Sequence, residues 1–302
     1  MHRKISFVIF VFLFGAIAWS ACDKIDDPLV VTDQKEYPEN PDDTLFFIDS
    51  VNITWKQVLL EDFTGHLCVN CPEAAELAHA ISENNDHRVV IYGVHAGTLA
   101  EPVPNTVFDT DLRSPLSIKL DDDFGPQAYP AAMINRVEYQ GLRTIYNKAT
   151  WESISLEQLD QPNAVNLKMI NTYFPKLNTL VIDVEAEFLS ETEGAYNLVV
   201  YLVEDHIEGA QLNNDPDIGP DTLFNYIHRN VLRAAVNTTY GEPVSDGSEI
   251  APGIPYAFRY TYPLKEEWVT ENCRIIAYIG KSDPELNLVD ILQVAELGIK
   301  TE

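Results

Sequence analysis

The chain has little positive charge. Its 302 residues include 20 lysines and arginines against 47 aspartates and glutamates, which gives a formal net charge of −27. A surface of this sign repels the phosphate backbone of DNA and RNA, so we exclude nucleic acid as a partner. The acidic balance favours solubility and identifies no other partner.

The N-terminal region lacks an apolar run long enough to cross a membrane. The run from Ile5 to Trp19 is shorter than the ~20 residues that a spanning helix needs. It follows a basic start and ends in Ser20-Ala21-Cys22, which is the order of a secretory signal peptide. We therefore predict a signal peptide over residues 1–21 and a destination in the cell envelope, where disulfides persist.

Ser20-Ala21-Cys22 resembles the bacterial lipobox, in which the cysteine becomes the lipidated first residue of the mature chain. The resemblance implies that a lipid anchor on Cys22 holds the protein in the outer membrane, on its periplasmic face or at the cell surface. Trp19 stands where leucine is usual, and the alternative is simple cleavage that leaves Cys22 as a thiol. We predict that residues 22–56 form the lipidated N-terminus and an acidic tether.

Cysteine is scarce, and two of the four cysteines, Cys68 and Cys71, are spaced C-x-x-C. They follow an apolar run, typical of a strand, and precede a helix-like composition, which is the arrangement of a thiol–disulfide site. The free N–H groups of a helix start stabilise a thiolate. We expect Cys68 to be the exposed reactive sulfur and Cys71 the resolving one. The alternative is a structural disulfide. Cys273 is expected to be a small buried hydrophobe.

Two histidines accompany these cysteines as supporting residues. His66 lies two residues before Cys68 and can steady its thiolate, whereas a His-x-Cys-x-x-Cys metal site would have three ligands where structural zinc uses four. We expect no metal and no cofactor. His95 ends the apolar run 88–95, a predicted buried parallel strand, at the edge where such sheets place ligand-facing groups. The alternative for His95 is a satisfied histidine at a strand end.

Two further segments resemble thioredoxin: Asp62-Phe63 before the C-x-x-C, and the stretch 125–136 around Tyr129-Pro130. The resemblance implies that Asp62 is a buried acid that accepts a proton from Cys71, which suits a carboxyl whose pKa burial has raised. It also implies a cis Tyr129–Pro130 bond beside the cysteines, where a partner peptide adds as a strand. The implied partner is a protein or peptide with a cysteine. The alternative for Asp62 is an exposed acid.

The pattern of elements divides the chain into two predicted domains. Residues 57–160 read as strands alternating with helices near 71–84, 111–124 and 149–159, and we predict an α/β thioredoxin-like domain there. Residues 163–302 hold many short alternating runs without helices, which predicts an all-β antiparallel sandwich domain. The polar segment from Glu208 to Asn225 is predicted to be a surface loop and a candidate for contacts.

Thr64-Gly65-His66, the C-x-x-C, the stretch 124–130 and the motif 228–233 together resemble the outer-membrane-protein-twenty-eight-related lipoprotein family. The resemblance implies an outer-membrane lipoprotein with a thioredoxin-like part, for which an adhesin or receptor role has been suggested. Two functions follow. The first is a lipid-anchored protein that exchanges thiols and disulfides with its partners. The second is a surface binding lipoprotein in which the C-x-x-C is a structural disulfide.

Overall fold

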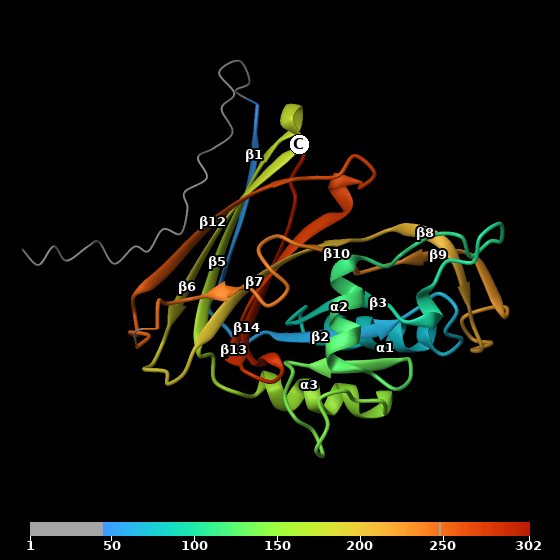
Figure 1. The fold of residues 1–302 in the computed structure, drawn as a ribbon, viewed down its shortest axis with the longest axis horizontal. Coiled ribbons are helices and arrows are strands. Elements are labelled where there is room, and N and C mark those ends of the chain that lie inside the picture. Colours follow the sequence, from blue (N-terminus) through green and yellow to red (C-terminus); the bar gives the residue numbers. More distant parts are fainter. Residues whose placement is uncertain (1–44, 248) are drawn as a thin grey trace, which may run out of the picture.

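The structure, a computed structural model, describes residues 45–247 and 249–302 (Figure 1). The predicted signal peptide, Cys22 and most of the predicted tether lie outside the described residues. Among the described residues, three α-helices are present: α1 (Cys71–Glu83), α2 (Pro115–Phe124) and α3 (Trp151–Leu159). None of the helices in the described part combines the length and apolar character that a membrane span requires.

Strands make up most of the regular structure, at 43% of the described residues against 17% in helices. The first seven strands are β1 (Phe47–Ile53), β2 (Val58–Thr64), β3 (Val89–His95), β4 (Ala131–Ile134), β5 (Val165–Phe174), β6 (Thr179–Phe188) and β7 (Tyr196–Glu204). The others are β8 (Ile207–Leu212), β9 (Thr222–His228), β10 (Val231–Ala235), β11 (Glu242–Pro243), β12 (Pro255–Pro263), β13 (Cys273–Asp283) and β14 (Asn287–Gly298).

One large mixed sheet organises the molecule. Its strand order is β14-β13-β7-β10-β3-β2-β4, with β11 added beside β7. The pairs β2–β3 and β10–β3 are parallel, and the other neighbours are antiparallel. A second, antiparallel sheet has the order β1-β5-β6-β12, and β8 and β9 form a separate hairpin that projects from one end of the molecule (Figure 1).

The predicted fold class, an α/β thioredoxin-like domain followed by an all-β sandwich domain, is wrong. The large sheet runs through both parts, because β3 pairs with β10 at Gly93 and Val231, and β10 pairs in turn with β7. Strand β7 is buried at all but one residue, which is the pattern of a central strand covered on both faces. Period-two alternation predicts strands but not their neighbours, so the sequence did not reveal this continuity. The chain folds as one β-rich structure.

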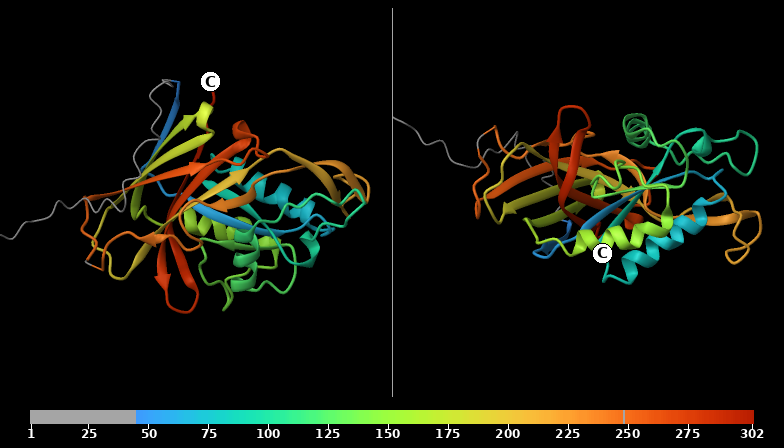
Figure 2. Two further views of the ribbon diagram at one scale, coloured as in Figure 1. Left: turned by 45° about the horizontal axis from the view of Figure 1, so that its top comes forward. Right: turned by 90° about the horizontal axis from the view of Figure 1, so that it is seen from below.

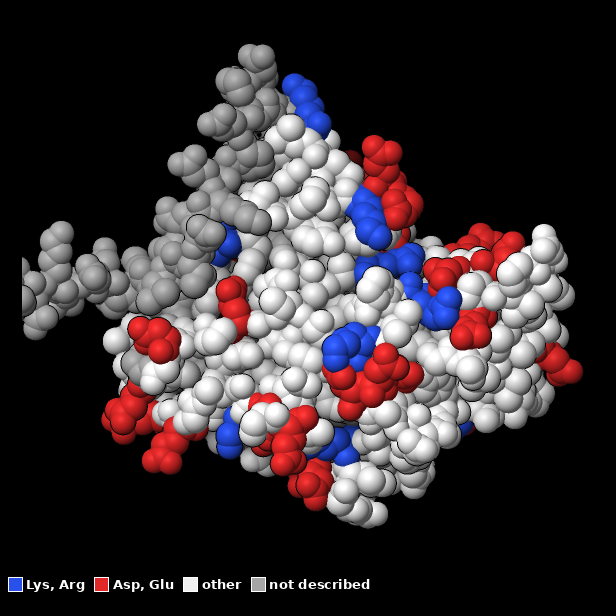
Figure 3. All heavy atoms as spheres, viewed as in Figure 1, with Lys and Arg blue, Asp and Glu red and all other residues white. Residues whose placement is uncertain are grey.

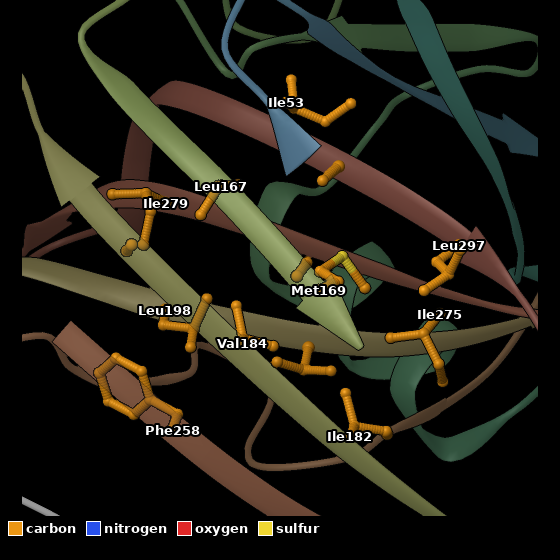
Figure 4. Close-up of a cluster of buried hydrophobic side chains, with 14 of the residues drawn as sticks. Ile53, Leu167, Met169, Ile182, Val184, Leu198, Phe258, Ile275, Ile279 and Leu297 are labelled. Atoms are coloured by element: carbon orange, nitrogen blue, oxygen red, sulfur yellow. The ribbon is translucent and has the colours of Figure 1, made fainter. Parts of the chain in front are cut away.

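Three apolar clusters fill the core. The first lies between the two sheets and includes Ile53, Leu167, Met169, Val184, Leu198 and Ile275 (Figure 4). The second packs α2 on one face of the large sheet, and the third packs α1 and α3 on the other face. The right-hand view of Figure 2 shows α1 and α3 together on one side of the strands, with α2 on the opposite side.

The helices begin and end where local chemistry dictates. Helix α2 starts after Ser114, whose hydroxyl accepts a hydrogen bond from the Ser117 N–H at 3.0 Å, while the Ser117 hydroxyl accepts one from the Ser114 N–H at 2.9 Å. It ends at Gly125, which has a left-handed φ of +52°. The predicted domain boundaries at 56/57 and 160/163 fall in connections between elements, and they stay predictions of where folding units would part.

Candidate disulfide site

The site begins at Gly65, where β2 ends and the chain turns toward α1. A Cβ at this position would lie 2.4 Å from the Leu99 carbonyl oxygen, so only glycine fits. The close approach lets the Leu67 N–H donate to the same Leu99 oxygen at 2.9 Å. The Cys68 N–H then donates to the Gly65 carbonyl at 3.0 Å, which folds the loop into a turn that delivers Cys68 beside the start of α1.

Cys68 and Cys71 form a disulfide, with their Cα atoms 5.4 Å apart. Cys71 is the first residue of α1, and Pro72 follows it in the first turn, where a missing N–H costs nothing. The expectation of an exposed Cys68 is wrong, because Cys68 is 3% exposed and Cys71 2%. The intervening Val69 and Asn70 are exposed. The loop therefore lies at the surface while its sulfurs point inward.

The β8–β9 hairpin covers this loop. The Leu212 N–H donates to the His66 carbonyl at 2.8 Å, and the Asn214 N–H donates to the Val69 carbonyl at 2.9 Å. The Gln211 side-chain amide donates to the Cys68 carbonyl at 3.0 Å. The predicted surface loop from 208 to 225 is thus largely a hairpin that is hydrogen-bonded to the C-x-x-C segment.

A small pocket lies behind the disulfide. Its lining includes Asp62, Cys71, His95, Gln211, Tyr226 and His228. The volume of about 40 Å³ leaves room for a few water molecules, each of which needs roughly 15 Å³. The structure thus brings together the predicted site residues Asp62, Cys71 and His95, which come from β2, α1 and β3.

Asp62 is buried on β2, as the resemblance to thioredoxin implied. It is 5% exposed, and within the described chain its Oδ1 atom has no hydrogen-bond partner. Burial raises the pKa of Asp62 to about 7, because the charged carboxylate is disfavoured away from water. Protonated and ionised forms therefore coexist near neutral pH. Its role as a proton acceptor for Cys71 stays a prediction.

Two buried histidines, His95 and His228, line the pocket, and a third, His66, precedes the C-x-x-C segment. The sequence indicated His66 and His95. The rings of His95 and His228 meet edge to face with centroids 5.8 Å apart. Burial, and then the neighbouring His228, hold the pKa of His95 well below its usual value, while burial lowers the pKa of His228 to about 4. Burial also lowers the pKa of His66, whose ring stacks on Phe108 at 5.9 Å. All three imidazoles are thus neutral at physiological pH.

Each of these imidazoles has one buried nitrogen without a partner among the described residues: His66 Nε2, His95 Nδ1 and His228 Nε2. Such atoms are satisfied in folded proteins by water, by an ion or by a mobile group. Within residues 45–247 and 249–302, no set of three or more His, Cys, Asp or Glu side chains has the arrangement to hold a metal. The pocket has room for a few waters, and these can bind the nitrogens of His95 and His228, which line it.

Tyr129 and Pro130 are not among the residues that line this pocket. The Tyr129–Pro130 peptide bond is cis, and β4 begins at the next residue. The Tyr129 hydroxyl donates a hydrogen bond to Asp121 of α2 and lies against Gly97. Burial and this hydrogen bond raise the pKa of Tyr129. Neither residue lines the pocket, so their predicted place in the site stays a prediction.

Gln211, Tyr226 and His228 are the site residues that the sequence analysis missed. All three belong to the β8–β9 hairpin, and 143 residues separate Gln211 from the Cys68 carbonyl that it contacts. The motif 228–233 contributed to the family resemblance, and it was the one indication that His228 had a particular role. No local pattern points to Gln211 or Tyr226.

Comparison with known proteins places the chain in a family. Residues 118–302, more than half of the chain, match the model of the family described as Outer membrane protein Omp28. The match leaves the C-x-x-C segment outside, so it does not support the thioredoxin-like part of the predicted resemblance. No curated protein matches.

Two solved structures share the fold. HBP35 of Porphyromonas gingivalis superimposes with a TM-score of 0.58 at 14% identity, over 81% of this chain and 76% of that one. An Agrobacterium tumefaciens protein does so with a TM-score of 0.50 at 13% identity, over 82% and 97%. At these identities the likeness concerns the fold alone.

The family match confirms the predicted outer membrane localisation, and the lipid anchor stays a prediction. The chain belongs to the Outer membrane protein Omp28 family.

Proposed function

We propose that this outer membrane protein exchanges thiols and disulfides with cysteine-bearing protein or peptide partners at Cys68–Cys71. One observation carries the proposal: the disulfide closes at the first turn of α1, and a buried carboxyl with a raised pKa lines the pocket behind it. A helix start stabilises the thiolate that leaves when the disulfide opens. A purely structural disulfide has no need of a buried acid whose Oδ1 atom lacks a hydrogen-bond partner among the described residues.

The exchange is a transfer of two electrons between two sulfur pairs. A thiolate of a partner dithiol attacks the Cys68 sulfur, the Cys68–Cys71 bond breaks, and Cys71 leaves as a thiolate that takes the proton of Asp62. The partner's second thiol then gives its proton to ionised Asp62 and, as the thiolate, attacks the mixed disulfide. Cys68 leaves as a thiolate and takes a proton from water. The partner is oxidised to a disulfide and the protein is reduced to a dithiol, and the reverse sequence reduces a partner disulfide.

The reduction potential of the pair tests this proposal. Catalytic pairs have potentials above about −300 mV, so a lower value for Cys68–Cys71 would mark a structural bond. We expect Cys71→Ser to accumulate mixed disulfides with envelope proteins on non-reducing gels, because the resolving thiol is missing. Cys68→Ser should accumulate none, and the buried Cys273→Ser serves as the control that leaves the pair intact. Equal behaviour of the two single variants would refute the proposal.

A second candidate function is a surface binding lipoprotein in which the disulfide is structural. The burial of both sulfurs beneath the β8–β9 hairpin favours this alternative, because exchange requires access to a sulfur. This alternative would be supported by a Cys68–Cys71 reduction potential below about −300 mV together with the absence of mixed disulfides in the Cys71→Ser variant.

We also propose the lipid anchor at Cys22, which lies outside the described residues. The Ser20-Ala21-Cys22 sequence supports it. The mass of the N-terminal peptide should include acyl chains on Cys22, and Cys22→Ser should move the protein from the membrane fraction to the soluble fraction. An unmodified N-terminus would contradict the anchor.

A further inference from the structure

The covered disulfide presents a problem of access. A partner thiolate must reach Cys68 or Cys71, yet both sulfurs are almost fully buried beneath the β8–β9 hairpin. We infer that the segment Gln211–Asn214 of this hairpin occupies the place of a partner strand, and that an extended partner peptide displaces it to reach the disulfide. That the partner is a cysteine-bearing peptide rests on the proposed function. That the segment Gln211–Asn214 is a displaceable cover over the disulfide does not.

The contacts are those of a strand laid along the C-x-x-C loop. Leu212 and Asn214 are two residues apart, and both backbone N–H groups donate to carbonyls of the loop, at His66 and Val69. In an extended chain the N–H groups of residues i and i+2 point to the same side, so any extended peptide can supply the same two donors. Added strands use main-chain hydrogen bonds of this kind for affinity.

Two side-chain amides complete the cover. The Gln211 amide donates to the Cys68 carbonyl at 3.0 Å, and the Asn214 amide donates to the Asn70 side-chain oxygen at 2.9 Å. Both bonds join the hairpin to the loop that carries the disulfide. Removal of either side chain therefore loosens the cover without touching the sulfurs.

The hairpin can move as a unit because it lies outside both large sheets. Among the described strands, β8 and β9 pair only with each other, and a two-stranded hairpin adds little stability of its own. The chain turns sharply at both of its ends, with left-handed backbone at His206 (φ +59°) and Asn230 (φ +60°). These two residues are natural pivots for a movement that uncovers the loop.

The outer side of the hairpin indicates an apolar partner. Phe224 is 64% exposed and Ile227 38% exposed on β9, and Val69 of the loop is 39% exposed. At the end of the molecule where the hairpin lies, Figure 3 shows an uncharged surface with acidic side chains at its margins, and the connection between β8 and β9 carries Asp215, Asp217 and Asp221. An extended peptide with apolar side chains fits this surface better than a charged one.

Reduction of the full-length oxidised protein by a small phosphine tests the cover. We expect Gln211→Ala and Asn214→Ala each to speed reduction about fivefold, because each loses one hydrogen bond that holds the hairpin closed. The matched control is Asn225→Ala, whose amide bonds to Glu208 within the hairpin and does not touch the loop. Thiols are counted by alkylation and mass spectrometry. Rates equal to that of the wild-type protein in both variants would overturn the inference.

Two cysteine peptides test the partner. One carries the sequence of residues 209–215 followed by a cysteine, and the other has proline in place of the leucine, which removes one of the two N–H donors. We expect the first peptide to form the mixed disulfide several-fold faster, and equal rates would overturn the extended-peptide partner. A reduction potential below about −300 mV, together with faster phosphine reduction of the alanine variants, would refute the proposed function. The same result would still show that the hairpin segment is a displaceable cover over the disulfide.

Discussion

Asp62 is a carboxyl group that the fold buries away from water. Its pKa is about 7 in the folded protein against the usual 3.8 of an aspartate side chain, because burial disfavours the charge. The folded state therefore holds its proton more tightly than the unfolded state. The resulting stability is fully present below about pH 4 and is lost as pH rises to about 7. Above pH 7 the buried charge costs ~4 kcal/mol.

We predict that Asp62→Asn removes this dependence. The variant should match the wild-type protein in free energy of unfolding near pH 4 and exceed it by up to ~4 kcal/mol at pH 8. Urea unfolding across this range measures the difference. The control is Glu76→Gln at the exposed edge of the same pocket, which should change the free energy by less than about 0.5 kcal/mol. A variant that is less stable at pH 8 would contradict the assignment of a buried charge.

His228 gives the opposite pH dependence. Burial lowers its pKa to about 4 from 6.5, so the unfolded state takes up a proton first as pH falls. The stability that this residue contributes is fully present above about pH 6.5 and is lost as pH falls to about 4, by up to ~3 kcal/mol. We predict that His228→Gln flattens the acid side of the stability profile, measured by thermal unfolding between pH 4 and 7. The half-exposed His79→Gln is the control, and a profile unchanged by His228→Gln would count against this account.

At the scale of elements, the sequence predicted the helices and strands whose positions depend on nearby residues. The three helices lie within the predicted ranges, because capping serines, first-turn prolines and terminal glycines act over one or two turns. The short apolar run that ends at His95 likewise predicted a strand, and β3 lies there. The sequence therefore predicted Asp62 on the strand before the C-x-x-C and His95 at the end of the next strand, whereas the pairing of these two strands came from the structure.

The β8–β9 hairpin could not be predicted in the same way. Its residues are polar and turn-rich, which is typical of a loop, and its position depends on hydrogen bonds to a segment more than a hundred residues earlier in the chain. Alternation within a strand likewise says nothing about the strand beside it. The errors in fold class and in the exposure of Cys68 share this cause, since both depend on long-range pairing.

The turn between β2 and the disulfide allows a sharp test at this scale. A methyl group at Gly65 would meet the Leu99 backbone at 2.4 Å, whereas one at Gly298, near the end of β14, would meet nothing within 4 Å. We predict that Gly65→Ala lowers the free energy of unfolding by about 1–3 kcal/mol through overpacking, with Gly298→Ala as the neutral control. Denaturant unfolding of the two variants measures this. Equal stabilities would mean that the turn tolerates a side chain.

At the scale of the whole molecule, a buried ion pair joins the two parts of the large sheet. Arg136, just after β4, binds Glu61 of β2 with Nε–Oε2 and Nη2–Oε1 distances of 2.7 and 2.8 Å, and neither side chain is exposed. The same guanidinium donates to the Leu288 carbonyl of β14 and to the Tyr278 hydroxyl of β13, both at 3.3 Å. The N-terminal and C-terminal parts of the chain thus share one charged network at their junction.

We predict that Arg136→Met lowers the free energy of unfolding by about 3–5 kcal/mol, because it leaves the Glu61 carboxylate buried without its partner. The loss of amide hydrogen-exchange protection should appear on both sides of the junction, in β2 and β4 as well as in β13 and β14, since the sheet is continuous. Arg113→Met is the matched control: its pair with Asp111 at 3.0 Å is partly exposed and worth less than about 1 kcal/mol. Loss of protection confined to β2 and β4 would instead mean that the two parts unfold separately.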